Sequence, residues 1–180
     1  EVLWVGKLDF RKQLSLAIQI IAKINNKNSS LHIVGSGNNE SYKKVAESLH
    51  VAEQCIWHGA VSHDKVQEIM QQSDIFFFTS VAEGTPHVVL EAIGNNLPIV
   101  CFDTCGQGDS VNEQIGMKIP LSTPQQSTKD FAEKINYLYH HREVLQQLSK
   151  QCSQRQAELS WDNKAQQMIR LYTKILNGNK

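Results

Sequence analysis

The chain has 180 residues, of which 41% are hydrophobic and 20% are charged, which suffices for one substantial core in a single domain, residues 1–180. Its 18 basic and 18 acidic residues give a formal net charge of zero, which argues against nucleic acid or a membrane surface as the partner. The sequence contains no CxxC pair and no apolar run of about 20 residues, so a disulfide framework, a metal site and a membrane span are not expected.

The N-terminal part of the chain alternates short apolar runs with stretches of helical periodicity. Strands are predicted over residues 1–5, 31–34 and 55–57, and helices over residues 14–24, 40–50 and 62–72. The loop after the first strand carries three cations that suit a diphosphate: Lys7, Arg11 and Lys12. A solvated basic turn is the commoner origin of such a cluster.

Gly35 and Gly37 follow the second predicted strand. Because the third glycine and the acidic residue of a dinucleotide-binding motif are missing, this pair predicts a tight turn into the next helix.

Residues 73–100 are the most informative stretch, because a strand, a loop, a helix and a second strand follow one another there. The strands are predicted over residues 74–78 and 98–100. The helix is predicted to begin at Thr85 or Pro86, since Thr85 is a good N-cap and proline suits the first helical position.

The start of this helix is predicted to bind an anion. Its first N–H groups point out of the carboxyl end of the sheet, where the helix dipole favours a phosphate, and they belong to His87, Val88 and Val89. Gly84 lets a ligand approach the backbone closely, and Glu83 hangs over the same opening. Glu91 lies one turn into the helix, within reach of a polar ligand.

The remaining elements are mostly helical. A loop after residue 100 leads to a short helix predicted over residues 109–114, and an edge strand is predicted over residues 117–119. Packing helices follow over residues 127–140 and 142–159, and a terminal helix is predicted over residues 160–177.

Short apolar strands that alternate with helices imply right-handed crossovers and a parallel sheet covered on both faces. We therefore expect an α/β, Rossmann-like, doubly wound sheet with extra C-terminal helices. Such sheets bind ligands at the carboxyl ends of their strands, and every candidate residue follows a strand or opens a helix. This convergence predicts a ligand site at that edge.

Residues 83–92, EGTPHVVLEA, resemble the E-x7-E signature of retaining glycosyltransferases of the GT-B fold, family 4, also called group 1. The resemblance covers Gly6 to Tyr172, and it implies one half of a GT-B fold, the C-terminal domain that binds the nucleotide-sugar donor. In that family the first glutamate is associated with the donor sugar and the second with the ribose hydroxyls. These roles fall on Glu83 and Glu91.

The family's diphosphate-binding loop resembles residues 6–12, which begin Gly6-Lys7-Leu8 and end at Lys12. Lys7 stands where the family has an arginine and lacks its bidentate fork, so Arg11 is a candidate to share the task. The resemblance implies donor or nucleotide contacts at a larger set of positions: Gly6, Arg11, Gly35, His58, Gly59, Val61, Gly84, Thr85, Pro86, His87, Val88 and Glu91.

The resemblance implies transfer of a sugar, with retention, from a nucleotide diphosphate sugar to a glycan, lipid or small-molecule acceptor. Glu83, Lys12 and Lys7 would carry the catalysis. No metal is expected, because lysines and N–H groups stabilise the diphosphate and the chain has no Asp-x-Asp.

The chain is expected to be one piece of a longer protein. We expect a missing N-terminal domain to hold the acceptor site and to receive the helix at residues 160–177, which leaves the isolated chain inactive. The cysteine pattern fits the cytoplasm, with any peripheral contact to the inner face of a membrane made by the missing half.

Two alternatives stay open. Lys7 in place of arginine and the irregular Gly106-Gln107-Gly108 loop fit a non-catalytic module that binds a nucleotide sugar. A sugar-nucleotide epimerase of the same GT-B architecture would bind the same donor, and its product would distinguish it. The terminal helix, in turn, could equally cap this domain alone.

Overall fold

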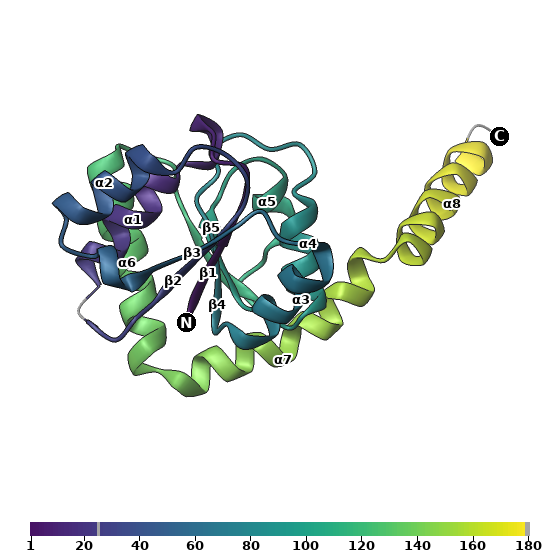
Figure 1. Cartoon of the computed structure of the whole chain (residues 1–180). Coiled ribbons are helices and arrows are strands. Elements are labelled where there is room, and N and C mark those ends of the chain that lie inside the picture. The colour runs from purple at the N-terminus through teal and green to yellow at the C-terminus, as the bar shows by residue number, and fades with distance from the viewer. Residues whose placement is uncertain (25, 179–180) are drawn as a thin grey trace.

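Six strands pair in parallel in the order β3-β2-β1-β4-β5-β6 in the computed structural model (Figure 1). The structure describes residues 1–24 and 26–178, so residues 25, 179 and 180 of the predicted domain lie outside it. The strands are β1 (Val2–Val5), β2 (Leu31–Val34), β3 (Cys55–Gly59), β4 (Ile75–Phe78), β5 (Ile99–Phe102) and β6 (Gly116–Ile119). The chain order reverses between β1 and β4, which is where doubly wound sheets bind their ligands.

Helices cover both faces of the sheet, which confirms the predicted Rossmann-like α/β fold. One face carries α1 (Leu14–Lys23), α2 (Glu40–Ser48) and α6 (Pro124–His140), and the other carries α3 (His63–Gln72), α4 (His87–Gly94) and α5 (Cys105–Ser110). The helix α7 (Arg142–Leu159) crosses beneath the sheet, since Leu145 and Leu148 pack in one core and Cys152 in the other (Figure 1). Two 3-10 turns complete the chain, η1 (Phe10–Lys12) and η2 (Ala52–Gln54).

The central strands are buried on both sides, which explains their unbroken apolar sequence. All four residues of β4 and all four of β5 are buried. On the α6 side, the ring of Phe131 meets Phe77 and Phe102 edge-on, at centroid distances of 5.1 and 4.9 Å. A parallel sheet covered on both faces selects such continuous runs over an alternating pattern.

Several predicted boundaries were wrong. The helix α6 begins at Pro124 rather than at residue 127, and β5 ends at Phe102 rather than at residue 100. The helix predicted from Thr85 begins at His87, because Pro86 is its N-cap with non-helical φ and ψ of −80° and 83°. The helix predicted over residues 109–114 lies earlier, as α5, because its first residue Cys105 takes the left-handed φ of 53° that turns the chain into the helix. The third strand extends to Gly59. Ser62 caps α3, since its hydroxyl accepts from the Lys65 N–H at 3.3 Å.

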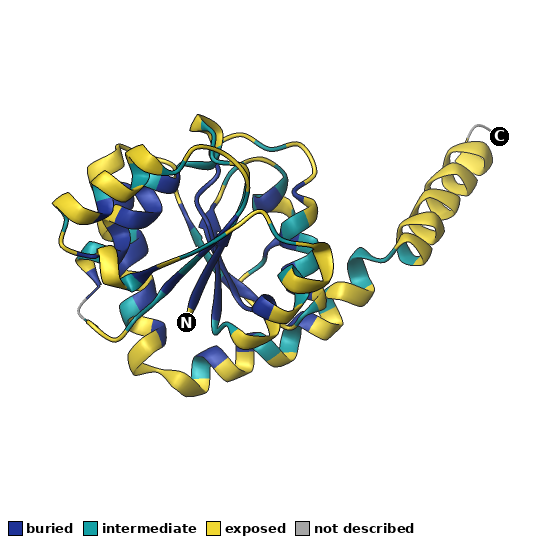
Figure 2. Cartoon of the chain, in the orientation of Figure 1, coloured by how far each residue is buried: buried dark blue, intermediate teal, exposed yellow. Residues whose placement is uncertain are grey.

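The terminal helix α8 (Trp161–Gly178) projects from the body of the domain, and it has no buried residue (Figure 2). Its apolar side chains lie in solvent: Trp161, Met168, Ile169, Leu171, Tyr172, Ile175 and Leu176. Packing of this helix on another domain stays a prediction. No helix within residues 1–24 and 26–178 is long and apolar enough to cross a membrane.

Candidate functional site

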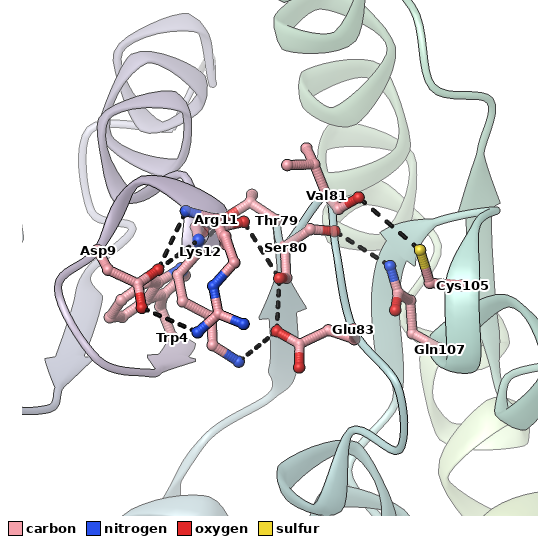
Figure 3. Close-up of polar contacts among 10 residues, drawn as sticks. All are labelled: Trp4, Asp9, Arg11, Lys12, Thr79, Ser80, Val81, Glu83, Cys105 and Gln107. Atoms are coloured by element: carbon pink, nitrogen blue, oxygen red, sulfur yellow. Dashed lines mark hydrogen bonds and ion pairs between the residues drawn. The ribbon is translucent and has the colours of Figure 1, made fainter.

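The loops that follow β1 and β4 meet at the carboxyl edge of the sheet through an ion pair. Lys12 Nζ lies 2.5 Å from Glu83 Oε1, although the two residues are 71 positions apart in the sequence (Figure 3). Their side chains are only 16% and 13% exposed, and the ammonium also lies 5.0 Å from the centre of the Phe78 ring. Two predicted catalytic residues are therefore brought together in a shielded position.

A hydrogen-bond network that reaches into the core holds the backbone of Lys12. Asp9 caps the turn η1, with its Oδ1 accepting from the N–H groups of Arg11 and Lys12 at 3.0 and 3.3 Å. The Thr79 hydroxyl lies 2.8 Å from the Lys12 carbonyl and accepts from the Trp4 indole N–H at 3.1 Å. Because Trp4 and Thr79 are fully buried in the sheet, the position of Lys12 is fixed by the core.

The same kind of network holds Glu83. The Ser80 hydroxyl lies 2.6 Å from Glu83 Oε1 and 3.1 Å from the Arg11 carbonyl, so its single proton serves one of them at a time. The Val81 N–H also donates to the Arg11 carbonyl, at 2.9 Å. The two loops are thus joined by backbone contacts as well as by the ion pair.

Glycines allow the strand ends to approach closely around Lys12. A Cβ on Gly35 would lie 1.7 Å from the Gly6 carbonyl oxygen, and Gly35 has a φ of +153°. A Cβ on Gly6 would meet the Trp4 ring and the Lys12 side chain at 3.2 and 3.3 Å. The predicted turn at Gly35 is therefore also a site of close backbone packing.

The start of α4 differs from the predicted anion site. The His87 N–H donates to the Thr85 carbonyl at 3.0 Å and the Val89 N–H to the Pro86 carbonyl at 2.9 Å, so two of the three predicted free donors are already used. These donors are used because the helix has Pro86 as its N-cap. Of the three N–H groups, only that of Val88 has no hydrogen-bond partner among the described residues.

The other predicted residues of this segment differ in exposure. Gly84, Thr85 and His87 are exposed, whereas Pro86, predicted to contact the donor, is buried. The half-buried Glu91 carboxylate makes no ion pair or hydrogen bond within residues 1–24 and 26–178. Gly84, Thr85 and His87 are thus more open to a ligand than the Glu83 side chain, which is 13% exposed.

The predicted three-cation clamp is not assembled. Arg11 is exposed and pairs with Asp9 Oδ2 at 3.3 Å, while Lys12 pairs with Glu83. Lys7 is exposed and forms no ion pair in the described part of the chain. Lys12 is the cation that the fold fixes, and the other two extend into solvent from the same loop.

The His58 side chain points to another histidine. Its Nε2 lies 2.9 Å from Nδ1 of His32, whose Nε2 lies 2.8 Å from Glu1 Oε2. Partial burial, then the neighbouring His32 and Lys65, lower the pKa of His58 below its ordinary value. The His58 ring is therefore engaged with His32, and a role of the His58 backbone in ligand binding stays a prediction.

The backbone beside His58 borders a small pocket. Gly59, with a φ of 68°, accepts from the Gly35 N–H at 2.9 Å. Gly35 and Gly59 line a pocket of about 250 Å³ together with Trp57, and the half-buried Val61 follows them in the chain. The predicted base-binding region is therefore hollowed.

Four polar residues of the site escaped the sequence analysis: Asp9, Thr79, Ser80 and Gln107. Thr79 and Ser80 were detectable in principle, because they are polar residues directly after a fully buried strand. Asp9 was detectable as a cap two residues before Arg11. No local sequence pattern pointed to Gln107, because its hydrogen-bond partner, the Ser80 carbonyl, lies 27 residues away in the sequence.

The chemistry of this edge suits an anion and hydroxyl groups. No group of three or more His, Cys, Asp or Glu side chains that could hold a metal ion occurs among the described residues. A lysine held in place by the core can stabilise a phosphate, and the adjacent carboxylate can accept hydrogen bonds from hydroxyls.

Comparison with known proteins agrees with this chemistry. The family model described as "Glycosyl transferases group 1" matches residues 1–155. The chain is 24% identical over 160 residues to the sulfoquinovosyl transferase SQD2 of Arabidopsis thaliana, covering 89% of this chain and 30% of that protein. It is 24% identical over 135 residues to the GPI3 subunit of a Saccharomyces cerevisiae phosphatidylinositol N-acetylglucosaminyltransferase, covering 73% and 29%.

Solved structures share the fold. The pneumococcal O-GlcNAc transferase GtfA, in complex with UDP and GlcNAc, matches with a TM-score of 0.80 and 20% identity over 97% of this chain and 35% of its own. Sucrose-phosphate synthase from Thermosynechococcus elongatus matches with a TM-score of 0.81 and 21% identity over 98% of this chain and 45% of its own. The chain thus spans less than half the length of these relatives. The six-stranded sheet is the Rossmann-like fold of these GT-B neighbours, and on the family match over residues 1–155 the chain belongs to the group 1 glycosyl transferases.

Proposed function

We propose that this chain binds the nucleotide diphosphate sugar donor of a retaining, family 4 glycosyltransferase and forms the C-terminal domain of that enzyme. The observation that carries the proposal is the shielded Lys12–Glu83 pair at the carboxyl edge of the sheet, where β1 and β4 diverge. Membership of the group 1 family and the fold shared with a UDP complex support it.

In this proposal the protein acts by electrostatic stabilisation. Lys12 binds the departing diphosphate, and Lys7 and Arg11 add charge from the same loop. Glu83 accepts hydrogen bonds from the donor sugar and orients it. Lys12 and Glu83 are held by the core before the donor arrives, so these two groups need little reorganisation as charge develops on the leaving group.

The rest of the donor lies along the same edge. Glu91, which has no side-chain partner within the described residues, accepts from the ribose hydroxyls. The exposed Gly84, Thr85 and His87 and the remaining N–H of Val88 border the phosphates. The backbone at His58, Gly59 and Val61 receives the base, beside the pocket of about 250 Å³.

We propose that no metal takes part, since cations and N–H groups neutralise the diphosphate. Activity of the natural protein should then survive treatment with EDTA. A metal requirement restored by Mg²⁺ or Mn²⁺ would contradict this part of the proposal.

The acceptor, a glycan, a lipid or a small molecule, is proposed to bind a further N-terminal domain of the natural protein. The exposed apolar side chains of α8, among them Ile169 and Leu176, would pack on that domain. We propose that the whole enzyme works in the cytoplasm, with any peripheral contact to the inner face of the membrane made by that half.

The proposal is tested by following the anomeric carbon of the sugar by NMR during turnover by the natural full-length protein. The expected product is a glycoside with the anomeric configuration of the donor. An inverted product refutes retention, an epimerised nucleotide sugar identifies an epimerase, and donor binding without turnover identifies a non-catalytic module.

A further inference from the structure

The short helix α5 touches the loop that carries Glu83 at two points. Gln107 is fully buried, and its Nε2 donates to the Ser80 carbonyl at 3.0 Å (Figure 3). Its neighbour Gly106 lies against the same loop, because a Cβ there would be 1.9 Å from the Gly84 carbonyl oxygen. The loop is therefore in contact with α5 on both sides of Glu83, at Ser80 and at Gly84.

Ser80 connects the contact with α5 to the Lys12–Glu83 ion pair. Its carbonyl is held by Gln107, and its hydroxyl lies 2.6 Å from Glu83 Oε1. Ser80 is itself only 1% exposed, so a change in its backbone moves the hydroxyl without compensation from water. The contacts form a continuous path from Gln107 through Ser80 to Glu83 and Lys12.

A glutamine at position 107 is not the residue that would give the most stable fold. Its Oε1 is buried without a hydrogen-bond partner among the described residues. Burying a carbonyl without a hydrogen-bond partner is destabilising, and an apolar side chain of similar length would avoid that cost. A residue that breaks a packing rule in this way, in contact with a site loop, is expected to serve the site.

We propose that Gln107 is a positioning residue for sugar transfer: its amide fixes the Ser80 backbone and thereby the place of the Glu83 carboxylate beside the donor sugar. This inference rests on the proposed function. Gln107 does not touch the donor in this role, so its loss should lower kcat far more than it raises the donor KM.

The experiment compares Gln107→Met with wild type in the natural full-length protein, measuring kcat, the donor KM and the free energy of unfolding. Methionine keeps the length of the side chain and removes the amide donor. We expect kcat to fall about 10-fold or more, with the KM changed less than about 3-fold, because small displacements of reacting groups are expensive. Thr128→Val is the control, since it removes a buried hydrogen bond of 2.6 Å to the Pro124 carbonyl in α6 and should leave kcat unchanged.

A second variant, Gln107→Glu, gives a signature that a purely structural role would not produce. Burial raises the pKa of a carboxyl group, and only its protonated form can donate to the Ser80 carbonyl. The kcat of this variant relative to wild type should therefore rise as the pH falls from 8 to 6, roughly in line with carboxyl protonation. The ratio for Gln107→Met should stay constant over the same range.

The possible failures are distinguishable. If wild type transfers sugar and Gln107→Met keeps its kcat, or if the kcat ratio of Gln107→Glu to wild type does not change with pH, the positioning role is refuted while the proposed function stands. If wild type binds and transfers no nucleotide sugar, the proposed function fails first, and the inference fails with it.

Discussion

The two ends of the sheet carry similar charges in different surroundings. At the carboxyl end, Lys12 and Glu83 pair with side chains only 16% and 13% exposed. At the amino end, Arg142 and Asp74 pair at 2.7 Å with side chains 55% and 36% exposed. The first pair is connected to the core through Thr79 and Ser80, whereas the second lies between surface groups. The comparison shows that an ion pair alone does not distinguish the candidate site. Its distinguishing features are the burial of the pair and the hydrogen bonds that hold the backbone on either side of it.

Cavity volume favours the opposite end of the sheet from the candidate site. A cavity of about 600 Å³ lies near the amino end, lined by residues of the turns around β2 and β3, among them Lys27, Glu47 and His50. The pocket beside Gly35 and Gly59 holds about 250 Å³. A pocket of this size fits a donor that is enclosed further by a second domain, as proposed above.

The largest expected effect is on catalysis. Glu83→Gln in the natural protein should lower kcat by about 100-fold or more, because loss of one preorganised contact costs about 2–4 kcal/mol. Asp74→Asn, the matched change at the amino end, should leave kcat within about 2-fold of wild type, since exposed pairs contribute little. Steady-state kinetics of the two variants measure this difference in kcat. Equal losses of kcat would contradict a special role for the carboxyl end.

The next effect is on stability. Lys12→Met leaves the shielded Glu83 carboxylate without its partner and should cost about 1–3 kcal/mol in the free energy of unfolding. Arg142→Ala should cost about 0–1 kcal/mol, because its pair is exposed. Denaturant unfolding of this chain gives both values. Adding Glu83→Gln to Lys12→Met should restore most of the loss, and failure to do so would contradict the pairing.

Cysteine labelling tests the accessibility of the carboxyl edge. Burial raises the pKa of the thiols of Cys55 and Cys152 to about 11 and of Cys101 to about 12. Cys105 is exposed, and the Glu83 N–H, then the Thr104 hydroxyl, lower the pKa of its thiol. Iodoacetamide followed by mass spectrometry should modify Cys105 first. Equal labelling of the buried thiols would show that the described packing is wrong.

A smaller effect is expected from pH at the histidine pair. Because the pKa of His58 is lowered below 6.5 by burial, His32 and Lys65, the unfolded chain binds a proton more readily than the folded chain. Stability should therefore be retained above pH 6.5 and decline as the pH falls below it. Thermal unfolding between about pH 7.5 and 5.5 measures this slope, which should be shallower in His58→Gln. If the pH dependence of stability in His58→Gln equals that of wild type, His58 is not its cause.

Much of the sheet was predictable because its strands are continuous apolar runs. β4 and β5 are buried on both faces and could be located without tertiary information. The loop between them carries Glu83, and its family resemblance is the basis of the predicted site. The pairing of Glu83 with Lys12 followed only from the topology, which brings β1 and β4 side by side.

What could not be predicted depends on contacts between distant segments. α5 begins at Cys105 with a left-handed φ of 53°, a conformation that the sequence gives no reason to expect of a cysteine. Gly106 suggested a flexible loop, but its lack of a side chain is needed for contact with Gly84. The role of Gln107 follows from the same contact, and therefore no local pattern shows it.

The most direct test of the central claim is a thermal-shift titration of this chain with UDP, GDP, ADP and their sugar conjugates. A nucleotide at 100 times its Kd should add about 2.7 kcal/mol of stability. We predict that one base raises the Tm of wild type and of Arg142→Ala, and that Lys12→Ala and Glu91→Ala lose the shift. A shift that persists in both Lys12→Ala and Glu91→Ala would place nucleotide binding elsewhere and contradict a donor site at the carboxyl edge.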